Sequence, residues 1–258
     1  MAKMESTSRT VTVALVLCIV CSLVVSSAAV LLKDRQDINK KIDRYTNILA
    51  AAGMLQADAG IEEQFNELVT SRVVDLNSGL FTDEVDADSF DQLRSAKDRD
   101  ISINLTSSED IAKISRRENF ALVYLVETDG QLNKIILPVR GYGLWSTLHG
   151  YLALEKDGQT VAGLGFYQHT ETPGLGGEVD NPRWKALWPG KKVYKDGGVE
   201  IQLVKGSVDP ASDSADYQID GLAGATLTSN GVTNLVQFWL GEQGFQKFLG
   251  KLYLGEAG

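Results

Sequence analysis

The sequence has very few of the side chains that bind transition metals. Two cysteines, Cys18 and Cys21, and two histidines, His149 and His169, occur among its 258 residues. Both cysteines fall in an apolar stretch near the N-terminus, so the rest of the chain has no thiol. Zinc and related ions need three or four such ligands together. We therefore predict no metal site in the globular part.

Basic clusters and nucleotide-binding loops are also missing. The formal net charge is −9, and no run of lysines and arginines occurs. An acidic chain without a basic patch is a poor ligand for nucleic acid, which we exclude as a partner. The sequence has neither a Walker-type phosphate loop nor a Gly-x-Gly-x-x-Gly fingerprint. An independent nucleotide-binding fold is therefore not expected, and NADH, if involved, binds elsewhere.

Charged side chains are absent from residues 11–32. At about 1.5 Å per residue, a helix of this length spans roughly 33 Å, against about 30 Å for the hydrocarbon core of a bilayer. We predict an uncleaved, single-pass transmembrane helix over 11–32, preceded by a short N-terminus over 1–10. A cleaved signal peptide is the main alternative, because residues 26–29 are small. Val30 to Leu32 continue the apolar run past that point, which favours the membrane helix.

One face of this helix carries small side chains. Ala14, Cys18, Ser22 and Ser26 recur every four residues, a spacing that lets a second membrane helix approach closely. The stripe predicts a membrane-embedded partner, although small residues are frequent in any membrane helix. Cys18 and Cys21 are interpreted as small side chains in lipid, with a redox or metal role as the alternative.

The region 33–118 is expected to be mixed and membrane-proximal. Apolar residues at helical spacing predict helices over 33–54 and 61–71. The polar segment 75–119 is expected to connect elements, with one short helix over 109–117.

From residue 120 the pattern changes to β structure. Alternating apolar runs separated by Thr-Asp-Gly and Lys-Asp-Gly predict two antiparallel hairpins. They cover 120–126 with 132–139, and 151–155 with 161–168. A further strand is expected over 199–204, and helices over 181–188, 232–240 and 245–253. The prediction is an α+β fold in which 119–258 form the ligand-binding domain.

The most informative stretch is Asp220 to Thr228, which reads Asp-Gly-Leu-Ala-Gly-Ala-Thr-Leu-Thr. Gly221 and Gly224 permit tight turns in which backbone N–H groups face an anion. A helix is expected to begin near 228–230, because Ser, Thr and Asn are good N-caps. Its N-terminus would place partial positive charge near a phosphate on Thr226. By its spacing alone the segment is more often an ordinary glycine-rich loop before a helix.

This stretch resembles the motif at which a flavin transferase esterifies the phosphate of FMN to a threonine, here Thr226. Ala223 departs from the motif, which usually has Ser or Thr at that position. Residues 141–145 (Gly-Tyr-Gly-Leu-Trp) and 169–177 (His-Thr-Glu-Thr-Pro-Gly-Leu-Gly-Gly) match the same family, in the family's order. Over essentially its whole length the chain resembles the covalent-FMN-binding subunit of bacterial sodium-translocating NADH:quinone oxidoreductases.

The resemblance implies a covalent FMN that passes electrons one at a time within a membrane complex of several subunits. That complex couples NADH oxidation by quinone (ubiquinone) to sodium export; no NADH or quinone site is expected on this chain. The resemblance also places the N-terminus in the cytoplasm and the large domain on the periplasmic side of the inner membrane. A flavin transferase would be a partner during maturation.

A bound flavin needs a flat apolar slot for its ring and donors for its polar edge. Leu144, Trp145 and Leu175 are candidates for the slot. Thr172 and the backbone amides of 174–177 are candidates for the edge, and Lys205 for a positive charge near the ring. The remaining expected cofactor-binding residues are Asp220, Gly224, Ala225, Leu227, Thr228, Glu171, Gly174 and Gly176.

Two alternative functions fit parts of the same pattern. The homologous flavin subunit of an Rnf-type ferredoxin:NAD oxidoreductase is close, but Gly-Leu-Trp at 143–145 and the long segment before residue 120 favour the sodium pump. A non-redox, membrane-anchored binding or scaffold domain is the alternative of another class. Trp145 would then be a core aromatic, Lys205 a solvated charge and Glu171 a surface acid.

Overall fold

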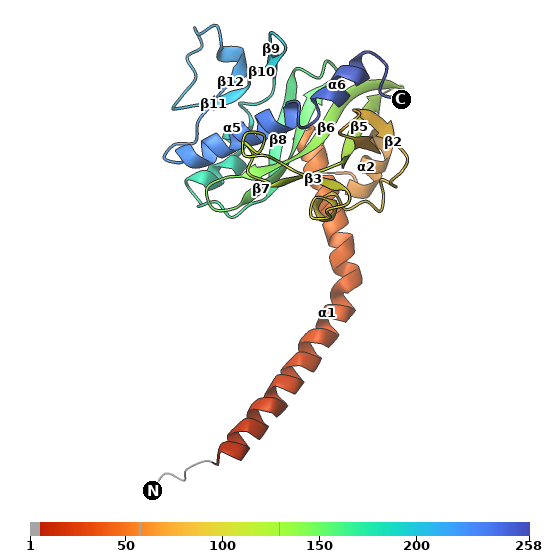
Figure 1. The fold of residues 1–258 in the computed structure, drawn as a ribbon, viewed down its shortest axis with the longest axis vertical. Helices are drawn as coiled ribbons and strands as arrows, with labels where there is room; N and C mark the ends of the chain where they lie inside the picture. Colours follow the sequence, from red (N-terminus) through yellow and green to blue (C-terminus); the bar gives the residue numbers. More distant parts are fainter. Residues whose placement is uncertain (1–5, 57, 129) are drawn as a thin grey trace. The chain divides into compact units, whose positions relative to one another are not determined.

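The computed structural model describes residues 6–56, 58–128 and 130–258. The chain divides into two compact units, Met1–Arg44 and Tyr45–Gly258 (Figure 1). A long helix comes first in the chain, and an antiparallel sheet with helices follows it, which confirms the predicted α+β class.

The N-terminal helix α1 runs without interruption over Thr7–Ala51. At about 1.5 Å per residue its 45 residues extend roughly 67 Å. Its apolar part is long and apolar enough to cross a membrane, judged by length and composition. Side chains there are exposed, including both cysteines and Leu31, which is 80% exposed. The helix predicted over 33–54 is the continuation of this same helix and ends three residues earlier.

The second unit is built on a six-stranded antiparallel sheet, counted over the described residues. Its order is β2 (Leu80–Thr82), β1 (Val69–Asp75), β5 (Phe120–Thr128), β6 (Gln131–Tyr142), β7 (Thr147–Glu155) and β8 (Val161–Gln168). Both predicted hairpins, β5–β6 and β7–β8, are confirmed. Strand β7 begins four residues before the predicted start and pairs with β6 up to Tyr142 and Thr147. The Gly-Leu-Trp stretch at 143–145 therefore lies in the tight connection between β6 and β7.

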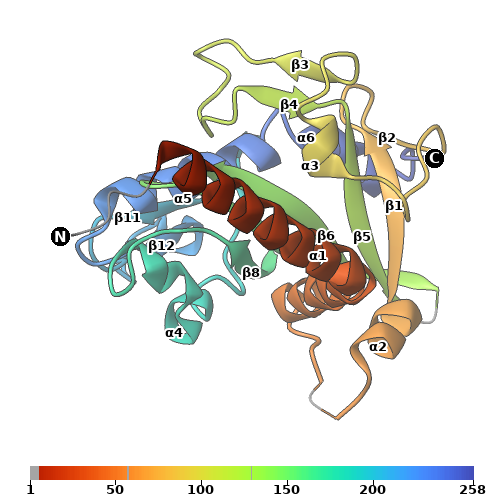
Figure 2. The same cartoon turned by 90° about the horizontal axis from the view of Figure 1, so that it is seen from below.

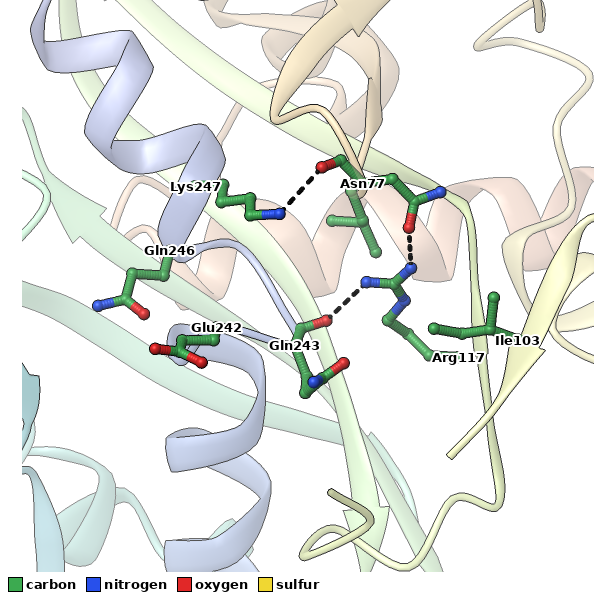
Figure 3. Close-up of a pocket in the computed structure, with 8 residues that line it drawn as sticks. Asn77, Ile103, Arg117, Glu242, Gln243, Gln246 and Lys247 are labelled. Carbon is green, nitrogen blue, oxygen red and sulfur yellow. Dashed lines mark hydrogen bonds between the residues drawn. The ribbon is translucent and has the colours of Figure 1, made fainter. Parts of the chain in front are cut away.

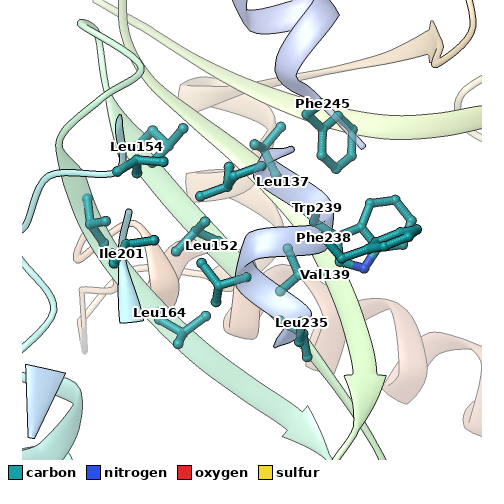
Figure 4. Close-up of a cluster of buried hydrophobic side chains, with 14 of the residues drawn as sticks. Leu137, Val139, Leu152, Leu154, Leu164, Ile201, Leu235, Phe238, Trp239 and Phe245 are labelled. Carbon is teal, nitrogen blue, oxygen red and sulfur yellow. The ribbon is translucent and has the colours of Figure 1, made fainter. Parts of the chain in front are cut away.

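One face of the sheet packs against the C-terminal helices α5 (Thr226–Leu240) and α6 (Gln246–Tyr253). Figure 4 shows Leu137 and Leu152 of the sheet beside Leu235 and Trp239 of α5. All four side chains are fully buried. Burial of one such side chain contributes about 1.5–3 kcal/mol, so this core fixes α5 firmly on the sheet.

The opposite face packs against the last turns of α1, from Tyr45 onward, and against α2 (Ile61–Leu68), as Figure 2 shows. Tyr45 stacks on Phe65 with 3.7 Å between ring centroids, and Phe65 meets Tyr124 of β5 edge-on. Ile48 and Leu49 are fully buried in the same cluster. The two faces of the sheet thus have separate cores, and α5, whose start carries Thr226, packs on the face opposite α1 and α2.

Two predicted helices differ from the structure. The helix expected over 61–71 ends at Leu68, because the β-branched residues that follow pair with β5 as strand β1. No helix occurs over 109–117 in the described part of the chain. Lys113 and Ser115 have positive φ angles of 54° and 64°, and the carboxylate of Asp110 accepts the amides of Ile114 and Ser115. These local bonds replace a helical turn.

Other boundaries also shift. The strand expected over 199–204 is two strands, β10 (Gly198–Val199) and β11 (Gln202–Val204). Strand β10 pairs with β9 (Tyr194–Lys195), whereas β11 runs parallel to β12 (Gln218–Asp220). Helix α4 (Pro182–Lys185) is shorter than the expected 181–188 and is capped by the side chain of Asn181. Helix α6 agrees with the prediction to within one residue.

The segment between β2 and β5, predicted to be mainly a connection, contains more regular structure than expected. It contains α3 (Gln92–Ser95) and a hairpin of β3 (Ser102–Asn104) and β4 (Arg116–Glu118). Two short 3₁₀ helices, η1 (Gly176–Asp180) and η2 (Ala215–Tyr217), lie later in the chain.

Candidate functional site

Thr226 is the first residue of α5, and its side chain is exposed. The residue before it, Ala225, is the N-cap and makes no side-chain hydrogen bond to the helix. Among the described residues no side chain caps the first amides of α5, so this helix end carries partial positive charge. The helix starts two residues earlier than predicted, which places Thr226 inside its first turn. An anion attached to Thr226 would sit at this end of the helix.

The acceptor loop, residues 220–225, is fixed in front of the helix. Gly224 has a φ of +71°, a region that only glycine enters without strain. The amide of Leu222 donates to Ser229 Oγ at 3.0 Å, and Ser229 Oγ donates to the carbonyl of Ala225 at 3.1 Å. A side-chain carbon of Leu175 lies 3.1 Å from where a Cβ on Gly224 would be. The 169–177 loop thus lies directly against the acceptor loop.

Glu171 joins all three family stretches. It is 5% exposed, and its carboxylate accepts hydrogen bonds from the amides of Leu144, Trp145 and Ser146 at 2.9–3.3 Å. The hydroxyl of Thr228, in the first turn of α5, donates to the same carboxylate at 2.7 Å. The interpretation of Glu171 as a surface acid is wrong. Its carboxylate holds the β6–β7 turn, the 169–177 loop and the acceptor helix together.

This environment decides the charge of Glu171. Burial raises the pKa of the carboxyl, but hydrogen bonds from Thr228 and from the three backbone amides outweigh burial and hold the pKa below its ordinary value. The group is therefore a carboxylate at neutral pH, which all four donors require. These hydrogen bonds occupy the carboxylate, so the role of Glu171 in this structure is to hold the three segments together. Direct contact of Glu171 with a cofactor remains a prediction.

The 169–177 loop is anchored at its start by His169. The amide of Glu171 donates to Nδ1 of His169 at 3.2 Å, so Nδ1 is an acceptor in this arrangement. The proton of the neutral ring then lies on Nε2, which is 2.8 Å from the carboxylate of Asp180. The amide of Thr170 also donates to Ser146 Oγ at 2.8 Å. The histidine is thus a fixed part of the loop.

Three large apolar side chains stand exposed at this site, one from each family stretch. Trp145 is 64% exposed, Leu175 44% and Leu227 59%. Leu144 is half-buried. Exposed apolar groups gathered on one site mark a binding surface, and a flat ring is the shape they would cover. The expectation that Trp145 would be a core aromatic in the non-redox alternative does not hold.

The backbone of the 174–177 turn is partly used by the turn itself. The amides of Leu175 and Gly177 donate to the carbonyl of Thr172 at 3.1 and 2.9 Å. These two amides therefore do not face a ligand, which corrects the expectation for the whole turn. Gly176 is buried, and a Cβ there would lie 2.5 Å from Thr228 Oγ1, so the turn packs against the start of α5.

Asp220 and Lys205 lie at the entrance to the acceptor loop. Asp220 Oδ1 accepts the amide of Val208 at 2.8 Å, and the Asp220 carbonyl accepts Nε1 of Trp184 at 3.0 Å. Trp184 is 7% exposed, and no motif in the sequence pointed to it. Lys205 is exposed and follows Val204, which pairs with Asp220 across β11 and β12. It lies one residue beyond this pairing, and its place near a bound ring remains a prediction.

Comparisons with known proteins agree with this site. Residues 143–241, which span all the segments above from the β6–β7 turn to the end of α5, match the model of the FMN-binding domain family. The chain is 56% identical to the NqrC subunit of the Na(+)-translocating NADH-quinone reductase of Pseudomonas aeruginosa, over the full length of both. It is 47% identical to the same subunit of Yersinia pestis, covering 97% of this chain and 95% of that protein.

Solved structures give the same result. The crystal structure of Shewanella oneidensis NqrC aligns with a TM-score of 0.76 at 35% identity, covering 84% of this chain and 99% of that one. The corresponding subunit of Parabacteroides distasonis aligns with a TM-score of 0.67 at 29% identity, covering 84% and 96%.

The fold and the site define an FMN-binding-domain protein with an apolar N-terminal helix. The full-length identity is specific enough to go further. The chain belongs to the NqrC family of subunits of the Na(+)-translocating NADH-quinone reductase. The family match decides against the Rnf-type alternative, and the FMN-binding domain against a non-redox scaffold.

Proposed function

We propose that this subunit relays electrons in the Na(+)-translocating NADH-quinone reductase through an FMN held by a phosphoester to Thr226. One observation carries the covalent part of the proposal. The exposed side chain of Thr226 stands at a helix N-terminus without a side-chain cap, near exposed apolar side chains from two loops (Trp145 and Leu175) and from the first turn of α5 itself (Leu227). The helix end favours a phosphate, and the apolar side chains favour the ring.

The burial of the neighbouring hydroxyls supports Thr226 as the point of attachment. Thr228 is fully buried and donates to Glu171, and Ser229 is 6% exposed and bonds inside the loop. Attachment at either of these would break a buried hydrogen bond and displace the helix start. Thr226 has neither restriction, so a transferase would reach it without unfolding the loop.

The residues present fit FMN, and each has a distinct task. The phosphate end would be held by Thr226 and the first amides of α5. Trp145, Leu175 and Leu227 would cover the ring and exclude water from it, and Lys205 would supply positive charge nearby. FMN, when bound, supplies the electron transfer itself, while the protein tethers and orients it.

The rest of the proposal concerns the surroundings of the domain. The apolar part of α1 would anchor the chain as a single pass in the bacterial inner membrane. The resemblance to the family is what favours the folded domain on the periplasmic side. A flavin transferase would attach the FMN during maturation. A covalent bond has a plain physical reason there, because a dissociated cofactor outside the cytoplasm would be lost by diffusion.

The test is the intact mass of the purified chain from cells that contain the transferase. The expected result is an FMN adduct, together with ultraviolet fluorescence of the denatured band. Thr226→Ala should abolish both signals. Thr228→Ser is the matched control, because it keeps the buried hydroxyl and should keep the adduct. A wild-type chain with only the polypeptide mass would refute the covalent proposal.

A further inference from the structure

A second site lies at the other end of α5, about 20 Å along the helix from Thr226 at 1.5 Å per residue. It is a cavity of about 660 Å³ formed by the end of β1, the β3–β4 hairpin, and the start of α6 with the turn before it (Figure 3). Its lining is Leu76, Asn77, Ile103, Arg117, Glu242, Gln243, Gln246 and Lys247.

Arg117, in the wall of this cavity, is a buried cation without a counter-charge. It is 3% exposed, and no carboxylate lies within ion-pair distance of it among the described residues. Its guanidinium donates to the carbonyl of Gln243 at 3.1 Å and to the side-chain oxygen of Asn77, both neutral (Figure 3). Nε is buried and has no partner among the described residues. A guanidinium stays charged in proteins, so this arrangement leaves a buried positive charge uncompensated.

The nearest acids are already engaged elsewhere. Glu118 holds Arg140 through two bonds of 2.6 Å, and the carboxylate of Asp75 accepts the amides of its own turn. Glu109 accepts the hydroxyl and amide of Thr106. Burial lowers the pKa of Arg117, and these three acids oppose that only from a distance. None of them neutralises the guanidinium.

A second cation stands at the rim. Lys247 is exposed, and its ammonium donates to the carbonyl of Asn77 at 3.2 Å, again a neutral oxygen. It has no ion-pair partner in the described part of the chain. Helix α6 begins beside it at Gln246 without a side-chain cap, which adds partial positive charge. Glu242 is the one acid in the lining.

We propose that this cavity binds a carboxylate, supplied by an acidic side chain of a neighbouring subunit of the reductase. Arg117 presents a planar fork that matches a carboxylate, and the ammonium of Lys247 lies at the rim to meet the same group. Leu76 and Ile103 give the apolar contact that a side-chain stem needs. The cavity alone supports binding of a carboxylate. The family membership of the chain supports a neighbouring subunit as the protein that supplies it.

The experiment uses the detergent-solubilised complex, isolated through a tag on another subunit. Lys247→Glu reverses the rim charge at an exposed position, so it leaves the fold intact. We expect it to lower the association of this chain with the complex by about tenfold or more, with the loss sharpest as salt rises. Lys251→Glu, one turn further along α6 and outside the lining, is the matched control and should bind like the wild type.

A photo-crosslinking residue at Ile103, on the rim, identifies the occupant. The expected product joins Ile103 to a segment of another subunit that carries Asp or Glu, and Lys247→Glu should remove it. Changing that acid to Lys should then restore association of the Lys247→Glu chain. Equal association of the Lys247→Glu and Lys251→Glu chains would overturn the proposal. So would saturable binding of free succinate by the purified full chain without any subunit cross-link.

The flavin is followed in the same samples to keep the two proposals separate. Lys247 lies far from Thr226, so Lys247→Glu should retain the full FMN adduct by mass. Loss of the adduct in the wild type would count against the covalent flavin and not against the cavity. Arg117→Gln is the confirming variant, and where it fails to fold the result from Lys247→Glu decides.

Discussion

The hydroxyl of Thr228 donates a 2.7 Å hydrogen bond to the carboxylate of Glu171, 57 residues earlier in the chain. Both side chains are buried, and Glu171 also receives the amides of the β6–β7 turn. The first turn of α5 therefore has a fixed position relative to the loops that carry Trp145 and Leu175. That position determines where a group attached to Thr226 can lie. The Thr228–Glu171 pair therefore orients the attached group without contacting the Thr226 hydroxyl.

Removing the hydroxyl of Thr228 tests this link. Thr228→Val keeps the shape of the side chain but leaves one oxygen of Glu171 without its strongest donor. We expect the free energy of unfolding to fall by about 1–3 kcal/mol, measured by urea denaturation in detergent. Thr228→Ser should lose much less, because it keeps the donor. Equal stability of the Val variant and the wild type would show that the bond contributes nothing.

The charge of Glu171 gives a prediction about pH. Its pKa is lower in the folded chain than in the unfolded chain, whose ordinary value is 4.5. The stabilisation is therefore complete well above pH 4.5 and is lost as the pH falls through the lower, folded value. Glu171→Gln cannot titrate. We expect the wild type to exceed this variant in stability at pH 7, and the difference to shrink toward pH 3. A difference that stays constant over this range would contradict the assignment.

Gly176 packs against the same pair. A Cβ at this position would lie 2.5 Å from Thr228 Oγ1 and 2.8 Å from Glu171 Oε2. Gly176→Ala should therefore push the two apart and destabilise the domain by about 1–3 kcal/mol in a thermal or urea unfolding experiment. Gly250→Ala in α6 is the control, because nothing lies within 4 Å of its added Cβ. It should be neutral or slightly stabilising.

The sequence predicted the local elements well where one periodic pattern covered a whole element. The hairpins β5–β6 and β7–β8 and helix α6 follow from alternation, turn residues and helical spacing. Prediction failed where tertiary pairing decides. Strand β1 continues directly from α2, and only its pairing with β5, some 50 residues later, makes it a strand. No window around residue 70 contains that information.

The candidate site, like the fold, was predictable only where local residue types carry the signal. The motif located Thr226 and the loops around it, because the residue types are themselves the signal. The role of Glu171 depends on donors from residues 144–146 and 228, so the sequence showed an acid in a loop and not its partners. Trp184 and Arg117 act through backbone carbonyls of distant segments, which leave no pattern in the chain.

Ala223 offers a prediction about attachment. It occupies a position where the family motif usually has Ser or Thr, and its side chain is exposed beside Gly224. A hydroxyl there would give the transferase one more group to recognise without disturbing the core. Ala223→Ser should therefore raise the fraction of chains that carry FMN, measured by intact mass, wherever attachment to the wild type is incomplete. A lower fraction in the Ser variant would show that the hydroxyl is not recognised.

Trp145 separates a contact with the cofactor from a contribution to the fold. Its ring is 64% exposed, and only its backbone amide is tied to Glu171. Trp145→Ala should consequently change the free energy of unfolding by no more than about 0.5 kcal/mol, since surface substitutions rarely do more. The attached flavin would lose its apolar cover, so its absorbance maximum and midpoint potential should shift while the mass adduct remains. An unchanged flavin spectrum and potential in Trp145→Ala would mean that the flavin ring does not contact Trp145 and lies against Leu175 and Leu227 alone.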